Sequence, residues 1–320
     1  MNILMCDTQY TFYLYYLLTP FNKFRDTFFV FDACFSPSIV EALEGAGMAC
    51  HQRSYYHLPL EQRPAAREEN REYLVQLIKE FSDYFKGDIC IYGQDHIDIS
   101  QILWNDKIRD IPFILLEDGV GNYRKKTTLD SPPFLQPGET TLGHNDRVLE
   151  IYLTGIWRIP NDLKRKVRIM DLRDLWGKKS HEEKQFFLGL YSLSQDVVDT
   201  ISKKSVCFLG GAFSNFGLLS LEQELRAYQK ILSQFDASDI YIKAHPTGGN
   251  IDYEKIFPKV PVIMNPVPFE ALYFLTGRRL QVVASIASTA SMIVDEEVDQ
   301  QFYDYEGTRI HLKSPCEDLV

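Results

Sequence analysis

Short apolar runs alternate with amphipathic stretches through most of the chain. The runs are apolar on both faces, which is typical of strands in a parallel sheet that is covered by helices on both sides. In the first half they predict strands at Ile3–Cys6, Thr27–Phe31, Asp88–Tyr92, Pro112–Leu116, Val148–Leu153 and Val167–Met170. Apolar residues at helical spacing between the strands predict helices after the polar turn Asp7–Gln9 and at Pro37–Ala46, Glu68–Phe85 and roughly Ser180–Ser202.

The same alternation restarts near residue 205. It predicts strands at Ser205–Leu209, Asp239–Lys243, Val260–Ile263 and Gln281–Ala284, and helices at Leu219–Phe235 and Pro268–Thr276. Alternating strands and helices indicate two α/β units, which we place at residues 1–203 and 204–320. Open parallel sheets bind ligands outside the carboxyl ends of their strands. The loops after Leu116, Leu209, Lys243 and Ala284 are therefore the candidate site loops.

Composition and charge argue against several classes of protein. The 320 residues include 44 Asp and Glu against 34 Lys and Arg, a net charge of −10 that argues against a general nucleic-acid binder. Six cysteines include no Cys-x-x-Cys pair, so we expect reduced thiols in the cytoplasm. We also expect no signal peptide and no membrane span, because the apolar stretch Tyr10–Phe21 is interrupted by Thr and Pro.

Two adjacent acids follow the predicted strand Pro112–Leu116. In Glu117-Asp118-Gly119, a carboxylate at the strand end could serve as a general base. The alternative is an ordinary turn with solvated acids, since Asp-Gly is a common turn pair.

A histidine follows the predicted strand Asp239–Lys243, in Lys243-Ala244-His245-Pro246. Because Pro246 forces the preceding residue into an extended conformation, the His245 imidazole could bind a phosphate or protonate a leaving group. The alternative is a histidine that caps the strand end through a backbone contact. The remaining histidines, His96 among them, read as surface residues.

Hydroxyl side chains follow the last predicted strand. Ser288 and Thr289 lie where a helix should begin, and hydroxyls with free N–H groups there form an anion site or simply an N-cap. Glu270 lies in the first turn of the helix Pro268–Thr276, where it either favours the helix dipole or holds a ribose diol. The sequence contains no phosphate-loop or dinucleotide fingerprint and no metal-ligand spacing, so we expect no bound metal.

Basic residues concentrate between Lys164 and Lys179, against the acidic background. Such a run is usually a solvated face, and it could also hold the protein at the anionic inner face of a membrane.

Four of these motifs, in this order, resemble glycosyltransferase family 52, the bacterial sialyltransferases, and the related capsular polysialyltransferases. They are Glu117-Asp118-Gly119, Lys243-Ala244-His245-Pro246, Val267-Pro268-Phe269-Glu270 and the Ser288-Thr289 pair. The segment after the first predicted strand differs from the family pattern. The family usually has Thr-Pro-x-Gln there, and this chain has Asp7-Thr8-Gln9-Tyr10.

The resemblance implies a GT-B architecture of two Rossmann-like domains. It implies an inverting, metal-independent transfer of sialic acid from CMP to a terminal sugar hydroxyl of a surface glycan, capsule or lipooligosaccharide. By the same resemblance, Glu117 is the general base with Asp118 beside it, and His245 binds or protonates the departing phosphate. Donor-binding roles fall to Gly119, Lys243, Pro246, Glu270, Ser288 and Thr289. A GT-B enzyme that uses another nucleotide sugar, such as a UDP-hexose, is the rival. The acceptor, the linkage, the number of sialic acids added, homodimer formation and which of Glu117 and Asp118 is the base stay open.

Overall fold

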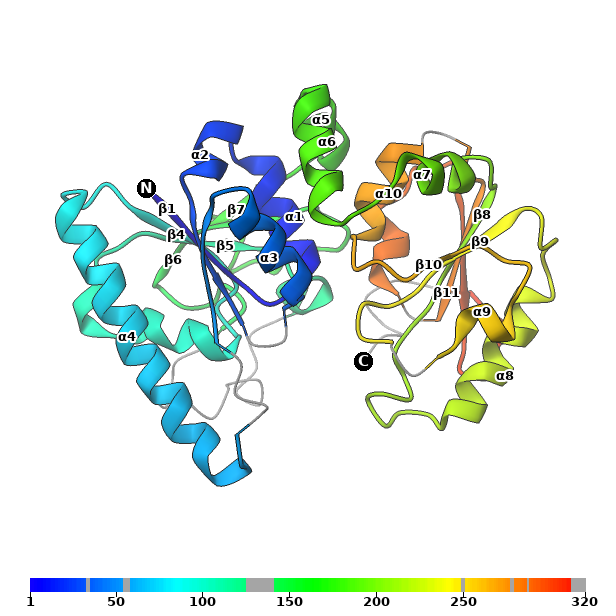
Figure 1. The fold of residues 1–320 in the computed structure, drawn as a ribbon, viewed down its shortest axis with the longest axis horizontal. Coiled ribbons are helices and arrows are strands. Elements are labelled where there is room, and N and C mark those ends of the chain that lie inside the picture. The colour runs from blue at the N-terminus through cyan, green and yellow to red at the C-terminus, as the bar shows by residue number, and fades with distance from the viewer. Residues whose placement is uncertain are drawn as a thin grey trace. The chain divides into compact units, whose positions relative to one another are not determined.

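The computed structural model describes residues 1–32, 35–53, 58–124, 141–248, 251–276, 279–286 and 288–311. The chain divides into two compact units, Met1–Lys184 and Gln185–Val320 (Figure 1). Each unit is a mainly parallel sheet with helices packed against it, which confirms the predicted α/β class of two Rossmann-like units.

Seven described strands form the sheet of the first unit, in the order β3-β2-β1-β4-β5-β6-β7, with every neighbouring pair parallel. They are β1 Asn2–Cys6, β2 Phe28–Phe31, β3 Ala49–Gln52, β4 Cys90–Gly93, β5 Phe113–Leu116, β6 Val148–Leu153 and β7 Val167–Ile169. The sequence did not predict β3, because this edge strand pairs with β2 alone and its Ala-Cys-His-Gln run is not apolar.

Helices α1 Gln9–Leu18, α2 Phe21–Arg25, α3 Pro37–Gly45, α4 Arg63–Tyr84, α5 Leu172–Lys178 and α6 His181–Leu190 accompany this sheet. One core cluster joins Ile3 of β1 to Ile78 of α4, and both side chains are fully buried. Aromatic rings fill another part of the core, where Phe12 of α1 lies 6.0 Å from Phe31 of β2 between ring centroids. Burying rings of this size contributes strongly to the stability of the unit.

Six described strands form the sheet of the second unit, in the order β10-β9-β8-β11-β12-β13. They are β8 Val206–Leu209, β9 Ile240–Lys243, β10 Val262–Ile263, β11 Val282–Ile286, β12 Asp299–Tyr303 and β13 Arg309–Ile310, and only β12 and β13 pair antiparallel. The helices are α7 Gln195–Ile201, α8 Leu221–Leu232, α9 Tyr253–Ile256 and α10 Phe269–Thr276.

The predicted helix Ser180–Ser202 is two helices. Helix α6 ends at Leu190, Ser192 adopts a positive φ of 50°, and Ser194 begins α7 by accepting a hydrogen bond from the Val197 N–H at 3.4 Å. Helix α7 packs against α10 in the second unit, although the predicted boundary at residues 203/204 assigns it to the first domain.

Strand order places a topological switch point in each sheet. Strands β2 and β3 are added on one side of β1, and β4 and the strands that follow it are added on the other side. The loops after β1 and β4 therefore lead in opposite directions at the carboxyl edge of the sheet. The second sheet repeats this arrangement at β8 and β11. Such divergent loops leave room for a ligand, and the candidate residues lie on them or on the neighbouring strands.

Within the described ranges, no helix combines the length and the apolar character needed to cross a bilayer. The described cysteines Cys50, Cys90 and Cys207 are free thiols. Cys34 and Cys316 lie outside the described residues.

Candidate active site

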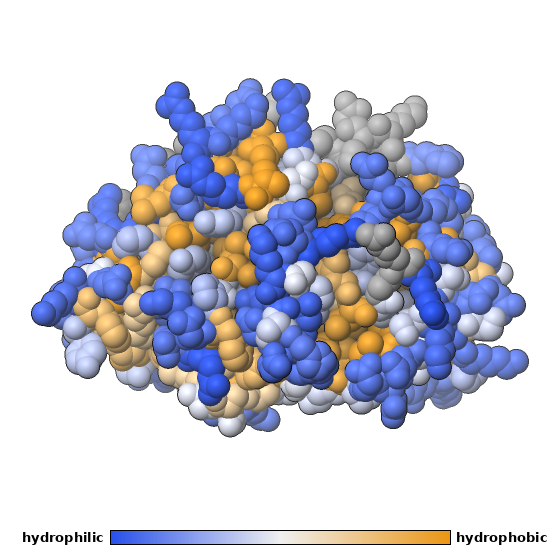
Figure 2. Space-filling view, turned by 90° about the horizontal axis from the view of Figure 1, so that it is seen from above, coloured by the Kyte–Doolittle hydropathy of each residue, from blue (hydrophilic) through white to orange (hydrophobic). Residues whose placement is uncertain are grey.

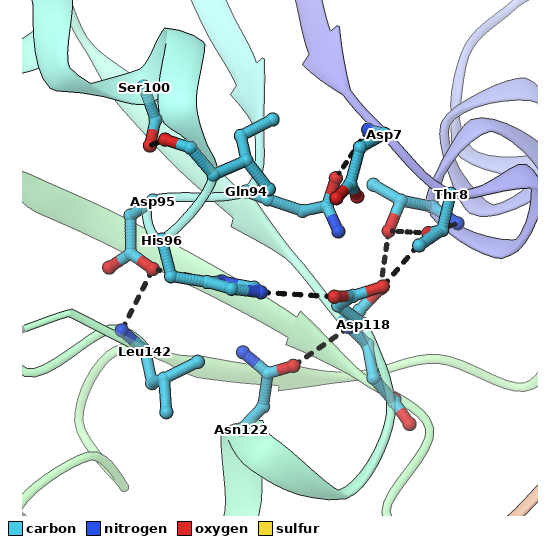
Figure 3. Close-up of polar contacts among 12 residues, drawn as sticks. Asp7, Thr8, Gln94, Asp95, His96, Ser100, Asp118, Asn122 and Leu142 are labelled. Carbon is cyan, nitrogen blue, oxygen red and sulfur yellow. Dashed lines mark hydrogen bonds and ion pairs between the residues drawn. The ribbon is translucent and has the colours of Figure 1, made fainter. Parts of the chain in front are cut away.

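Loops after three neighbouring strands bring polar side chains together at the carboxyl edge of the first sheet (Figure 3). Gly93 at the end of β4 makes this possible, because a Cβ there would lie 1.8 Å from the Met5 carbonyl oxygen of β1. Its φ of +139° also lies in the region that favours glycine. The backbone of β4 therefore approaches β1 closely, and the residues after Gly93 reach the loop that follows β5.

Asp118 is the carboxylate at the centre of this group. Its Oδ1 accepts a hydrogen bond from Thr8 Oγ1 at 2.9 Å, and its Oδ2 lies 3.1 Å from His96 Nε2. The Asp118 backbone N–H donates to Asn122 Oδ1 at 2.7 Å. The Asp118 side chain keeps 17% of its surface exposed, so a ligand can reach it.

His96 lies between two carboxylates. Its Nδ1 is 3.7 Å from Asp95 Oδ1, and Asp95 accepts hydrogen bonds from the backbone N–H groups of Leu142 at 2.8 Å and Gly143 at 2.9 Å. Burial lowers the pKa of His96, but the hydrogen bond to Asp118 and the charges of Asp118 and Asp95 outweigh it and raise the pKa to about 10. The imidazole is therefore a cation at neutral pH.

Glu117, by contrast, is turned into the protein and has no exposed surface. The Thr154 hydroxyl lies 2.8 Å from Glu117 Oε2, and the Tyr123 hydroxyl donates to the same oxygen at 3.2 Å. The backbone N–H of Thr154 donates to it as well. Burial raises the pKa of Glu117 to about 7, against the opposing effect of these hydrogen bonds. Glu117 thus ties the end of β5 to the segment after β6.

Several buried polar atoms around Asp118 have no hydrogen-bond partner among the described residues. They are Gln94 Nε2, Asn122 Nδ2, Asp7 Oδ1 and His96 Nδ1. The Gln94 side chain is fully buried and Asn122 keeps 1% of its surface. Burial and the charge of Asp118 raise the pKa of Asp7 to about 6. Folded proteins rarely leave buried donors and acceptors unpaired, so this group suits a ligand that carries hydroxyls.

In the second unit, His245 follows β9 as the sequence predicted. Its Nδ1 accepts a hydrogen bond from the Thr247 backbone N–H at 3.2 Å, which leaves the proton of the neutral ring on Nε2. Burial, followed by the charge of Lys243, lowers the pKa of His245. The Phe216 ring lies 6.4 Å from the imidazole, edge to face. His245 is therefore a neutral N–H donor at neutral pH.

Lys243 lies in the interior, with 5% of its surface exposed. Its Nζ donates to the Ala244 carbonyl at 2.6 Å, and burial lowers its pKa to about 8 against the charges of Cys207 and Glu270. The ammonium thus supports the backbone that carries His245. Pro246 is exposed on the same loop.

The remaining predicted donor-binding residues lie at helix starts in the second unit. Glu270 is buried in the first turn of α10. Ser288 precedes the 3₁₀ turn Thr289–Ile293, and its side chain makes no capping hydrogen bond there. Both Ser288 and Thr289 are half-buried, and Ala287 between them and β11 lies outside the described residues. Since β9 and β11 flank β8, the loops of His245 and Ser288 follow strands only about 10 Å apart.

The predicted candidate loop after Leu209 lies at this edge as well. Glu224 of α8, fully buried, accepts hydrogen bonds from the backbone N–H groups of Phe213 at 3.3 Å and Ser214 at 2.8 Å. The Tyr228 hydroxyl donates to Glu224 at 2.7 Å and accepts from the Gly211 N–H at 2.6 Å. These contacts hold the loop after β8 beside the His245 loop.

Comparison with known proteins adds the family. The sequence model of glycosyltransferase family 52 matches residues 62–313, which is most of the chain. The chain belongs to glycosyltransferase family 52. This confirms the resemblance drawn from the motifs. An uncharacterized protein of Haemophilus influenzae is 30% identical over 226 residues, 71% of each chain.

Two solved structures share the fold of this family 52 chain. A sialyltransferase from Photobacterium damselae superposes with a TM-score of 0.58 and 14% identity, covering 93% of this chain and 89% of that one. The α/β-galactoside α-2,3-sialyltransferase of Photobacterium phosphoreum gives a TM-score of 0.60 and 13% identity, covering 95% and 90%. Identities this low show the GT-B fold, and the reaction has to be argued from the site.

Asp7, Thr8 and His96 are the site residues that sequence reasoning missed in the family 52 chain. The loop after the strand Asp88–Tyr92 was not among the candidate loops, and His96 was read as a surface residue. Its signal was its place just after a buried strand. In the part of the chain that the structure describes, no group of three or more His, Cys, Asp or Glu is arranged to hold a metal ion.

Side chains in the basic run Lys164–Lys179 largely bind carbonyl and carboxylate oxygens of the same chain. Lys166 Nζ donates to the Asn145 carbonyl at 2.7 Å, Arg168 pairs with Glu150 at 3.0 Å, and Lys179 Nζ is buried against the Thr19 carbonyl at 2.8 Å. Figure 2 shows hydrophilic and apolar side chains interleaved on one face of the molecule. Contact with an anionic membrane stays a prediction.

Proposed function

We propose that the protein is an inverting sialyltransferase that moves sialic acid from CMP-N-acetylneuraminate to a sugar hydroxyl of a bacterial surface glycan. Family membership supports a glycosyltransferase. The shared fold of the two Photobacterium sialyltransferases supports the choice of sialic acid as the transferred sugar. We propose that the reaction needs no metal ion.

We place the general base at Asp118, one residue beyond the position that the resemblance implies. The observation that carries this choice is the exposure of the two acids. Asp118 keeps 17% of its side chain exposed, whereas Glu117 has none and is hydrogen-bonded to Thr154. A base must come within hydrogen-bond reach of the hydroxyl whose proton it takes. The unpaired atoms of Gln94, Asn122 and Asp7 would bind other hydroxyls of the acceptor.

On the donor side, His245 would donate its Nε2–H to the CMP phosphate. Ser288 and Thr289 would hold the same phosphate, and Glu270 the cytidine ribose. Charge builds on that phosphate as the bond to sialic acid breaks, and fixed donors stabilise such charge most when the site excludes water. Lys243 acts indirectly in this scheme, because its ammonium holds the Ala244 carbonyl next to His245.

Incubation with CMP-sialic acid and a panel of lactose-type and sialylated acceptors tests the activity. Formation of a sialylated product supports the proposal, and donor hydrolysis or transfer from UDP-hexose alone contradicts it. Thermal shifts with CMP, UDP and GDP give an independent readout, since a ligand that binds the native state raises its stability by mass action. We expect CMP to give the largest shift.

Paired variants test which acid is the base. Asp118→Asn should lower kcat about 10²–10⁴-fold with CMP affinity unchanged, which is the contribution of a positioned base. Glu117→Gln should keep most of its turnover per folded molecule. Asp106→Asn, on an exposed 3₁₀ turn of the same unit, is the matched control. An inactive, folded Glu117→Gln together with an active Asp118→Asn would place the base at Glu117.

A further inference from the structure

The pair His96–Asp95 lies on the loop after β4 and contacts the proposed base. Asp95 is 1% exposed and fixed by two backbone N–H groups, those of Leu142 and Gly143. His96 lies between this fixed carboxylate and Asp118, with Nε2 3.1 Å from Asp118 Oδ2. The His96 imidazole thus lies between the buried carboxylate of Asp95 and the partly exposed carboxylate of Asp118 (Figure 3).

The charges around His96 explain why a cation is needed at this place. Carboxylates face it from three loops: Asp7 after β1, Asp95 within its own loop, and Asp118 after β5, with the buried Glu117 next to Asp118. Like charges brought together repel and favour protonation of one another. An imidazolium among them offsets that repulsion and lets the carboxylates lie close together.

Geometry limits the orientations of the Asp118 side chain. His96 occupies Oδ2 and Thr8 donates to Oδ1, so the plane of the carboxylate is set by contacts from two different loops. Each carboxylate oxygen can accept more than one hydrogen bond, so a lone pair remains for a substrate hydroxyl. Gln94 Nε2 and Asn122 Nδ2, both buried and unpartnered among the described residues, carry the donors for that substrate.

We propose that His96, paired with Asp95, is a positioning residue that orients the Asp118 carboxylate for proton abstraction from the acceptor hydroxyl. The inference rests on the function proposed above, since it assigns to His96 a role in that reaction. His96 itself touches no reacting atom in this scheme, and it acts through Asp118 alone.

Kinetics separate positioning from a structural role. In His96→Ala we expect kcat to fall about 10- to 100-fold, the range that misplacement of a reacting group produces, with CMP affinity unchanged. The acidic limb of the pH–rate profile should also move up by about one pH unit, because the acids have lost their neighbouring cation. His96→Gln keeps an N–H donor and should recover part of kcat, while the limb stays shifted. His51→Gln is the matched control, since His51 also makes a side-chain hydrogen bond, to Asn70, but lies on the edge strand β3.

A measurement that needs no turnover keeps the two proposals apart. With ¹³C-labelled histidine, the His96 resonance of the wild-type protein should titrate near pH 10. In Asp118→Asn it should titrate at least one pH unit lower, since one of its two carboxylates is gone. A His96 that titrates near its ordinary pKa in the wild-type protein, or a His96→Ala protein with wild-type kcat and pH profile, would overturn the positioning role. A wild-type protein that transfers no sialic acid would overturn the proposed function instead, and the histidine titration would be unaffected.

Discussion

Glu117 makes the stability of the first unit depend on pH in a way that one substitution removes. Burial raises the pKa of Glu117 in the folded protein from 4.5 to about 7. The folded state therefore holds the proton more tightly than the unfolded chain. The stability that this proton contributes is fully present below the unfolded-state pKa and is lost as the pH rises through the folded-state pKa. At 1.36 kcal/mol per pKa unit, the loss is about 3 kcal/mol in total, of which about 2–3 kcal/mol falls between pH 5 and pH 8.5.

Glu117→Gln keeps the shape of the neutral acid and cannot ionise. The free energy of unfolding of the variant, relative to the wild-type protein, should therefore rise by about 2–3 kcal/mol from pH 5 to pH 8.5. A constant offset from the altered hydrogen bonds to Thr154 and Tyr123 adds to this at every pH.

Urea denaturation followed by tryptophan fluorescence measures this difference in the correct unit, because Trp104, Trp157 and Trp176 all lie in Met1–Lys184. Glu61→Gln, at an exposed position, controls for the loss of one carboxylate. A difference between Glu117→Gln and wild type that stays constant across this pH range would refute the assignment of a buried, proton-binding Glu117.

Three further outcomes are expected. His245→Ala should slow transfer severely and weaken CMP binding while the melting temperature changes little, because among the described residues the imidazole contacts Thr247 of its own loop and Phe216; a clear drop in melting temperature with normal transfer per folded molecule would make the histidine structural. Gly93→Ala should strongly lower the melting temperature, since the new Cβ would lie 1.8 Å from a backbone oxygen, whereas Gly45→Ala, with nothing within 4 Å, should not. EDTA should leave transfer unchanged, and activity that is lost to EDTA and restored by magnesium or manganese would contradict this.

The periodicity of the chain was enough to predict most of the fold. Buried strands such as β1 and β5 appear in the sequence as short apolar runs, because both of their faces are covered by helices. Strands with several polar residues lack that signal. β3, β12 and β13 were missed for this reason, since each lies at or next to a sheet edge and carries polar residues. The break between α6 and α7 was missed as well, because one residue of positive φ at Ser192 leaves the apolar spacing nearly intact.

Site residues were predictable where a motif ends a strand. Glu117-Asp118, His245 and the Ser288-Thr289 pair all follow predicted strands, and the structure places each at the carboxyl edge of its sheet. The sequence could not show that two adjacent acids differ in burial and in hydrogen-bond partners. Glu117 and Asp118 are adjacent acids of similar chemistry, yet one is buried against Thr154 and the other is partly exposed beside His96.

The sequence alone therefore determined the class of fold, the order of its elements and the strand ends where chemistry would be found, because these depend on local periodicity and on residues close together in the chain. Only the tertiary structure decided that His96 meets Asp118, 22 residues away, and that Thr8 meets it from 110 residues away. The strand order that inserts β4 between β1 and β5 creates both contacts. The protonation of Glu117, His96 and His245 depends on the burial and charges that such long-range contacts produce, and no local pattern records them.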